Sequence, residues 1–305
     1  MQKIFAHAKP MAMKFKSRLC SILLLLICTL SAQAQLLWKV EIPGSKTASY
    51  IFGTHHFAPV SMIDSVQGLR QAMADTERVI GEVDMKLMTT PEAMMSMQSK
   101  MMAPADSTLS VVLSPAQLDS LTTVWNGYTG GTPSIQMLDA VKPGVVTTQL
   151  SALQALKVLP SFNPTQGLDQ SFQDLARKEG KEVAGLETVD FQFNMLFGKP
   201  ISEQAENLMD AVRRDAELSE KVVKLTNAYM TQDLKAVEEC ILDPEMEKDD
   251  LEELIYSRNA TWADSLATLL PEKATLVVVG AGHLPGDRGL LQLLRKKGFK
   301  VTSIK

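Results

Sequence analysis

The sequence predicts an α/β protein with a central, mostly parallel mixed sheet flanked by helices. Three observations predict this fold class. Short apolar, β-branched segments alternate with amphipathic helical ones, several of the strand segments end at a glycine, and strand signals fade in the middle of the chain. With 45% hydrophobic and 22% charged residues, the composition is that of a globular protein, which excludes disorder and a collagen-like fibre.

The first predicted elements are two strands, a helix and a third strand. Residues 36–42 and 49–52 read as a hairpin around the turn at 43–45, and the second strand ends at Gly53. A single helix is expected over 62–76, since its apolar residues fall on one face. Residues 78–81 form a short buried strand that ends before Glu82.

A methionine-rich stretch at about 85–165 reads as a helical insertion that covers one edge of the sheet. Ser114-Pro115-Ala116-Gln117 is a strong helix start, with Pro at the first helical position and Gln three residues after the cap. The methionines could hold copper, but adaptable packing within a lid is the favoured interpretation.

The alternation of strands and helices then resumes. The wholly apolar strand at 275–279 is expected to be central and parallel. The other expected elements are a helix over 168–179 stopped by Gly180, a strand over 182–186, helices over about 202–270 with a break near 242–244, a helix over 287–297 and an edge strand over 300–304.

The first 34 residues read as a signal peptide. Lys14, Lys16 and Arg18 precede an apolar run, and Ala32-Gln33-Ala34 supplies the small-x-small pattern of a cleavage site. A retained anchor is the alternative, but the run is short for a bilayer and no second one follows. We expect a single domain over 35–305, periplasmic or secreted, with no stable membrane span.

Cleavage would make the protein more acidic. It removes five Lys and Arg residues and no acidic ones, so the formal net charge falls from −4 to −9. No basic stripe occurs, so nucleic acid is not an expected partner. Cys240 would be the only cysteine left, which excludes an intramolecular disulfide.

Polar residues stand at or just past the carboxyl ends of four predicted strands. Sites in open parallel sheets form at this edge, so these side chains should converge. The residues are His55 and His56, Glu82, Glu187, and His283. All three histidines of the mature chain lie in two turns, Gly53-Thr54-His55-His56 and Gly280-Ala281-Gly282-His283, which favours a functional role.

Two kinds of chemistry suit such a set. Two imidazoles and a carboxylate can hold a divalent cation that activates water, or the same groups can act as general base and acid without a metal. Spacing does not decide between them. No Gly-x-Ser-x-Gly elbow and no phosphate-binding loop occurs. Arg258 could bind a substrate carboxylate or pair with Glu252 or Glu253 on its own helix.

The residues resemble the TraB/GumN family, which includes the Tiki membrane-tethered proteases. The resemblance extends over nearly all of the mature chain. It is carried by Leu37-Trp38-Lys39-Val40, Ser49-Tyr50-Ile51-Phe52 with the first Gly-x-x-His turn, Val79-Ile80-Gly81-Glu82, Gly167-Leu168-Asp169, Gly185-Leu186-Glu187-Thr188 with Gln192, Arg258-Asn259-Ala260-Thr261-Trp262, and Val278-Val279 with the second turn and Leu284-Pro285-Gly286.

The resemblance implies a fold similar to the erythromycin-esterase and ChaN-like group. It also implies metal-dependent peptidase chemistry on a peptide or protein substrate, with manganese or cobalt suspected and zinc possible. By position, His56, His283 and Glu82 are the motif residues that would hold the metal or its water. His55 occupies a variable place. Unlike the Tiki proteins, this chain shows only a cleavable signal.

We therefore expect an exported metal-dependent hydrolase, most simply a peptidase. His56, Glu82, His283 and Glu187 are the expected catalytic residues. Arg258, Asn259 and Gln192 are the expected substrate-binding residues. Two alternatives stay open: a non-catalytic haem- or metal-binding protein of the ChaN-like type, in which His and Met would be iron ligands, and a metal-free esterase that uses histidine and glutamate.

Overall fold

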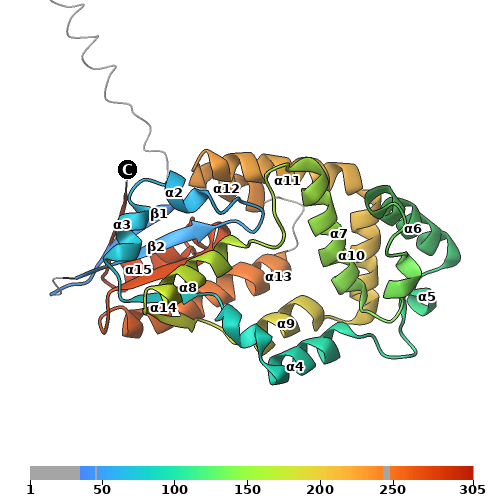
Figure 1. Ribbon diagram of the computed structural model, residues 1–305, viewed down its shortest axis with the longest axis horizontal. Helices are drawn as coiled ribbons and strands as arrows, with labels where there is room; N and C mark the ends of the chain where they lie inside the picture. The colour runs from blue at the N-terminus through green and yellow to red at the C-terminus, as the bar shows by residue number, and fades with distance from the viewer. Residues whose placement is uncertain (1–34, 45–46, 243–247, 305) are drawn as a thin grey trace, which may run out of the picture. The chain divides into compact units, whose positions relative to one another are not determined.

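The centre of the fold is a mixed sheet with the strand order β4-β3-β5-β2-β1-β6 (Figure 1). The computed structural model describes residues 35–44, 47–242 and 248–304, and the predicted signal segment lies outside them. Within these ranges the sheet has six strands. They are β1 (Leu37–Glu41), β2 (Ala48–Thr54), β3 (Arg78–Gly81), β4 (Glu182–Gly185), β5 (Thr275–Gly280) and β6 (Lys300–Ser303).

Four neighbouring strands of this sheet run parallel. β3 pairs in parallel with β4 and β5, and β5 pairs in parallel with β2. β1 is antiparallel to both β2 and β6. Residues 275–279 of β5 are fully buried, as befits a β-branched strand covered on both faces. The expected fold class, the hairpin at the start and the central position of β5 are confirmed.

Helices pack around the sheet and share one hydrophobic core with it. In α8, Leu168, Phe172 and Ala176 recur every four residues and are fully buried, so one face of this helix joins the core. The elements that surround the sheet are α2 (Met62–Ser65), α3 (Leu69–Ala74), α8 (Leu168–Lys178), α12 (Leu234–Ile241), α13 (Lys248–Leu251), the π-helical turn η3 (Glu252–Tyr256), α14 (Ser257–Leu269), η4 (Ala281–His283) and α15 (Leu290–Lys296).

A second hydrophobic core belongs to helices α5, α6, α7 and α10, which lie beyond the carboxyl ends of the strands (Figure 1). Trp125 and Leu121 are two of its buried large side chains. We call these four helices the helical lobe. The remaining helices are η1 (Met85–Thr89), α4 (Pro91–Met101), α5 (Leu109–Val112), α6 (Pro115–Thr129), η2 (Ile135–Leu138), α7 (Pro143–Val158), α9 (Val189–Phe197), α10 (Ile201–Arg213) and α11 (Asp215–Met230).

Three of the four lobe helices, α5, α6 and α7, come from the predicted insertion. α6 begins with the expected capping box of Ser114 and Gln117. The lobe also includes α10, which lies outside the predicted insertion at 85–165. Many of the methionines remain at the surface, with Met95 72% exposed, so they do not fill a second core.

Two predicted helical stretches are wrong in their continuity, and one helix is wrong in its start. Residues 202–242 are divided into α10, α11 and α12, with breaks at Arg214 and at 231–233; the predicted break near 242–244 lies partly outside the described residues. The stretch 62–76 is split into α2 and α3, because Gly68 has φ +80° and breaks the helical path. α15 begins at Leu290 rather than at 287, after Gly286 with φ +82°. Gly68 and Gly286 explain these two differences, because the spacing of apolar residues does not reveal a glycine with positive φ.

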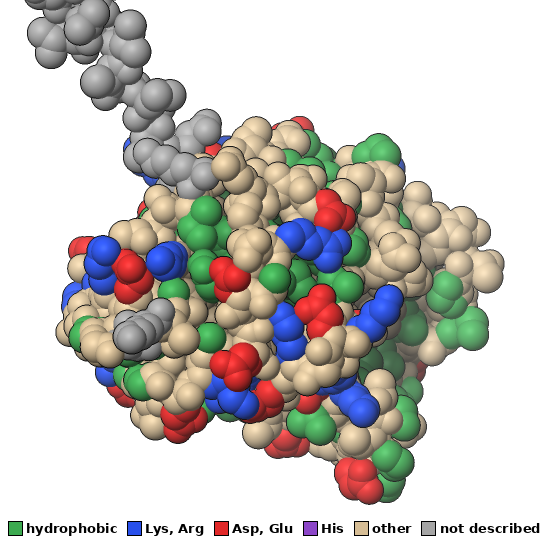
Figure 2. Space-filling view, turned by 60° about the vertical axis from the view of Figure 1, so that its left-hand side comes forward, with side chains coloured by type: hydrophobic (Ala, Val, Ile, Leu, Met, Phe, Trp, Pro, Cys, Tyr) green, Lys and Arg blue, Asp and Glu red, His purple; other side chains and the backbone are tan. Residues whose placement is uncertain are grey.

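In the part of the chain that the structure describes, no helix combines the length and hydrophobicity needed to cross a membrane. Acidic and basic side chains are interspersed over the face shown in Figure 2, with hydrophobic side chains between them.

Candidate active site

Strand register brings the two Gly-x-x-His turns together. β2 and β5 are parallel neighbours, with Gly53 opposite Val279 and Thr54 opposite Gly280. A Cβ atom on Gly53 would lie 3.0 Å from the Cα of Ala281 and 2.8 Å from Cδ1 of Leu284. Only a glycine therefore lets the two turns touch at this distance.

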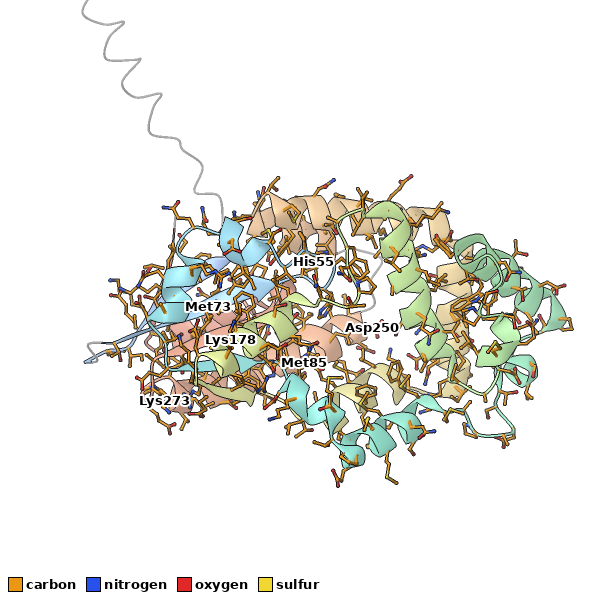
Figure 3. The ribbon with its side chains drawn as sticks, in the orientation of Figure 1. His55, Met73, Met85, Lys178, Asp250 and Lys273 are labelled. Atoms are coloured by element: carbon orange, nitrogen blue, oxygen red, sulfur yellow. The ribbon has the colours of Figure 1, made fainter. Side chains whose placement is uncertain are left out.

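Residues that follow the strands lie at one edge of the sheet. In Figure 3, His55 and Met85, which follow β2 and β3, lie toward the helical lobe, whereas Lys273, which precedes β5, lies at the opposite end. β3 and β4 end in register, with Gly81 opposite Gly185. The carboxylates just after them therefore start from the same edge as the histidine turns.

Arg258 of α14 is the centre of a buried charged cluster at this edge. Its Nε and Nη2 atoms donate to the two carboxylate oxygens of Glu187, at 2.8 and 3.0 Å. Nη2 also donates to Oε2 of Glu82, at 2.8 Å. The Arg258 side chain is 6% exposed. Arg258 thus pairs with two carboxylates from other elements, and the predicted alternative of a pair with Glu252 or Glu253 is wrong.

Leu254 and Trp262 contact this guanidinium, and Gln192 holds its two carboxylate partners. The π-helical turn η3 precedes α14, and the carbonyl oxygen of Leu254 within it accepts a hydrogen bond of 2.8 Å from Nη1 of Arg258. The ring of Trp262 lies 4.6 Å from the guanidinium carbon. Trp262 Nε1 and Gln192 Nε2 both donate to Glu187, and Gln192 also donates to Glu82.

Glu82 is held ionised by its surroundings. Burial raises its pKa, but the charge of Arg258 and the hydrogen bond from the Gly280 N–H favour the ionised form and outweigh burial, so the pKa lies below its usual value. The Gly280 N–H donates to Oε1 of Glu82 at 2.8 Å. The first glycine of the second motif therefore also binds the motif carboxylate.

His283 is a buried, neutral imidazole. Nε2 lies 3.1 Å from Nη1 of Arg258, and Nδ1 lies 2.7 Å from Oδ1 of Asn259. Arginine can only donate, so Nε2 accepts and Nδ1 carries the proton. Burial lowers the pKa of His283 to about 4. Asn259 donates its amide to the carbonyl of Arg288 at 3.0 Å, so both of its polar atoms serve to hold His283.

His56 stands apart from this cluster. Its side chain is 79% exposed, and Nδ1 lies 3.6 Å from Oδ2 of Asp169. Thr54 donates to the other oxygen of Asp169 at 2.8 Å. Interaction with Asp169 raises the pKa of His56, and the charge of Glu82 acts in the same direction. His56 is thus an accessible imidazole oriented by a carboxylate.

Asp169 is not among the site residues predicted from the sequence. It lies in the first turn of α8, where an acidic residue is ordinarily explained by the helix dipole. Gly167-Leu168-Asp169 was noticed only as part of the resemblance. No local spacing links Asp169 to His56, because Thr54 and Asp169 meet across 115 residues of chain.

His55 faces away from the charged cluster. Its Nε2 contacts the hydroxyl of Thr226 at 2.9 Å, and its ring lies against Phe57 and Tyr229. Burial lowers the pKa of His55 to about 4. These contacts give His55 a packing role between β2 and α11.

The donor atoms can be compared with what a metal ion needs. Glu82 Oε1 and His283 Nε2 are 3.9 Å apart, but the positively charged guanidinium of Arg258 binds Glu82 and lies against His283. The lone pair of His283 Nε2 already accepts from Arg258. No group of three or more His, Cys, Asp or Glu side chains in the described ranges is arranged to hold a metal ion. As placed, these donors suit the guanidinium of Arg258 and do not fit a metal.

The fold and the site define a class: an α/β protein with a buried Glu–Arg–Glu–His cluster and an accessible histidine at the carboxyl edge of its sheet. The chain belongs to the TraB/PrgY/gumN family, whose model matches residues 36–303. The predicted family is thereby confirmed. Comparison with curated proteins and with solved structures gives no match.

Proposed function

We propose that this protein is an exported hydrolase that cleaves a peptide or ester bond at the carboxyl edge of its sheet. The observation that carries the proposal is the opposite tuning of two groups at that edge. The pKa of Glu82 lies below its usual value, and the pKa of His56 lies above it. Titratable pairs whose pKa values are driven apart are the usual acid and base of an active site.

In this proposal Glu82 is the general base and His56 the general acid. Ionised Glu82 accepts a proton from the attacking water, and protonated His56 donates one to the leaving group. Asp169 positions the imidazole and favours its charged form. Arg258 favours the ionised form of Glu82 and also donates hydrogen bonds to Glu187.

Glu187, Gln192, Asn259 and His283 are positioning residues in this proposal. Gln192 donates to Glu82 and Glu187, Glu187 accepts from Arg258, and Asn259 holds His283 against Arg258, so each of them acts by holding Glu82 or Arg258 in place. The residues expected to bind substrate thus support the catalytic carboxylate instead.

The expectation of a peptide substrate and a divalent metal rests on the family resemblance. The expectation of export rests on the signal-like first 34 residues. The donor geometry does not fit a metal. Binding of manganese, cobalt or zinc therefore stays a prediction, which metal analysis of the purified protein would test. Full activity after dialysis against a strong chelator would favour the metal-free route through Glu82 and His56.

The test is hydrolysis of a peptide library and of aryl esters by the protein of residues 35–305, read by mass spectrometry. We expect cleavage by the wild type and its loss in Glu82→Gln. Leu196→Ala, a change at an exposed residue of α9, should cleave like the wild type. Absence of cleavage by the wild type, with and without added Mn²⁺, Co²⁺ or Zn²⁺, would contradict the proposal.

A further inference from the structure

A cavity of about 790 Å³ adjoins the charged cluster. Glu187 and Arg258 form part of its wall, so it reaches the same two side chains that hold Glu82 in place. Cavities of this size accommodate ligands as large as a short peptide segment. Neither His56 nor Glu82 lines it, so the cavity lies beside the proposed catalytic groups.

One side of the cavity is apolar. Leu186, just after β4, and Phe191 and Met195 of α9 line it. The side chain of Phe191 is 48% exposed, so its aromatic ring is accessible to a ligand in the cavity. Burial of such a surface by an apolar side chain would be favourable.

The opposite side is acidic. Asp249, Glu252 and Glu253 of α13 and η3 line it. Glu252 is paired with Arg288, at 2.6 and 2.7 Å. Among the interactions of the described residues, neither Asp249 nor Glu253 has a basic partner. The carboxylates of Asp249 and Glu253 are therefore available to bind a cationic group of a ligand.

Cations close to the cavity are already neutralised. Lys199 bonds to Asp250 at 2.5 Å, and Figure 3 labels Asp250 on α13. Lys100, which donates to Asn194 of the cavity wall, pairs with Asp190 at 3.0 Å. The charge balance of the cavity therefore favours a cationic ligand over an anionic one.

We infer that this cavity is the substrate-recognition subsite, and that it takes an apolar side chain flanked by Lys or Arg in a peptide. The inference rests on the proposed function for its place in catalysis, but peptide binding can be measured without turnover. Phe191 would contact the apolar side chain, and Asp249 and Glu253 the basic one.

The experiment measures binding of fluorescein-labelled peptides, with a central Leu-Lys, Leu-Gln or Gly-Lys pair, to the His56→Ala protein of residues 35–305. The Leu-Lys peptide should bind about tenfold more tightly than the other two, and the preference over Leu-Gln should shrink at high salt. Asp249→Asn with Glu253→Gln should abolish that preference. Phe191→Ala should weaken binding of both Leu peptides.

Matched controls are Leu196→Ala, on the same helix and 47% exposed, and Asp119→Asn with Glu206→Gln, two exposed acids outside the cavity. Neither control should change binding. Equal affinity for the three peptides, or an unchanged preference in Asp249→Asn/Glu253→Gln, would overturn the inference and leave the hydrolase proposal standing. Selective binding without any cleavage by the wild type would contradict the hydrolase and support the subsite.

Discussion

Nη1 of Arg258 lies 3.1 Å from Nε2 of His283, so a permanently charged donor points at the lone pair of the motif histidine. A protonated Nε2 would place two donors against each other. The same guanidinium binds Glu82 and Glu187. One arginine therefore favours the neutral form of His283 and the ionised form of Glu82, and it binds Glu187 as well.

The first prediction concerns the pH dependence of stability. The pKa of His283 is about 4 in the folded protein, against about 6.5 when unfolded. Between these values the unfolded chain binds the extra proton, so the contribution of His283 is complete above about pH 6.5 and is lost as the pH falls toward 4.

Urea unfolding at pH 7 and pH 5 checks this prediction. On acidification the wild type should lose about 1–2 kcal/mol more unfolding free energy than His283→Gln does. His55, whose pKa is also about 4, contributes in the same window and stays present in both proteins. Equal losses in the two proteins would show that His283 titrates normally.

Removal of the Arg258 charge should be severe. Arg258→Met leaves two buried carboxylates without their cation, so we expect unfolding free energy to fall by about 3–5 kcal/mol, measured by urea denaturation. The control is Arg288→Met, since the Arg288–Glu252 pair is about half exposed and its loss should barely move the midpoint. Equal shifts in the two variants would argue against the cluster.

The close approach of the two histidine turns predicts the effect of a single methyl group. Gly53→Ala should lower the unfolding free energy by about 1–3 kcal/mol, because the new Cβ would overlap Ala281 and Leu284. Gly127→Ala in α6, where a Cβ meets nothing within 4 Å, should leave stability unchanged or slightly increased. An unharmed Gly53→Ala protein would mean that the turns do not touch.

A positioning role for Asp169 predicts a change in the pH dependence of kcat/KM. In the proposed mechanism, kcat/KM falls at high pH as His56 loses its proton. Asp169→Asn removes the interaction that raises the pKa of His56, so this alkaline limb should move to lower pH. A rate loss with the limb unmoved would assign Asp169 a merely structural part.

Much of the fold was predictable because it depends on local pattern. The β-branched run of β5, the glycine at or next to the last residue of β2 and β3, and the capping box of α6 are each encoded within a few residues. The convergence of Glu82, Glu187 and His283 followed from the rule that parallel strands end at one edge. Gly68 was missed because periodicity counts apolar side chains and not backbone φ.

Partner choice within the site was not predictable. Arg258 has acidic neighbours in the sequence, Glu252 and Glu253 of η3, yet its partners Glu82 and Glu187 follow two strand ends. Asp169 resembled a helix-start residue, and its pairing with His56 depends on how α8 lies against β2. Such contacts are set by tertiary packing across long stretches of chain.

The most direct test of the central claim is a double-mutant comparison of kcat/KM on a cleaved peptide. Glu82→Gln and His56→Ala should each lower it by about 100-fold or more, and the double variant should be little worse than the poorer single one, since acid and base act in the same step. Wild-type cleavage by either single variant would contradict the assignment of Glu82 and His56 as base and acid.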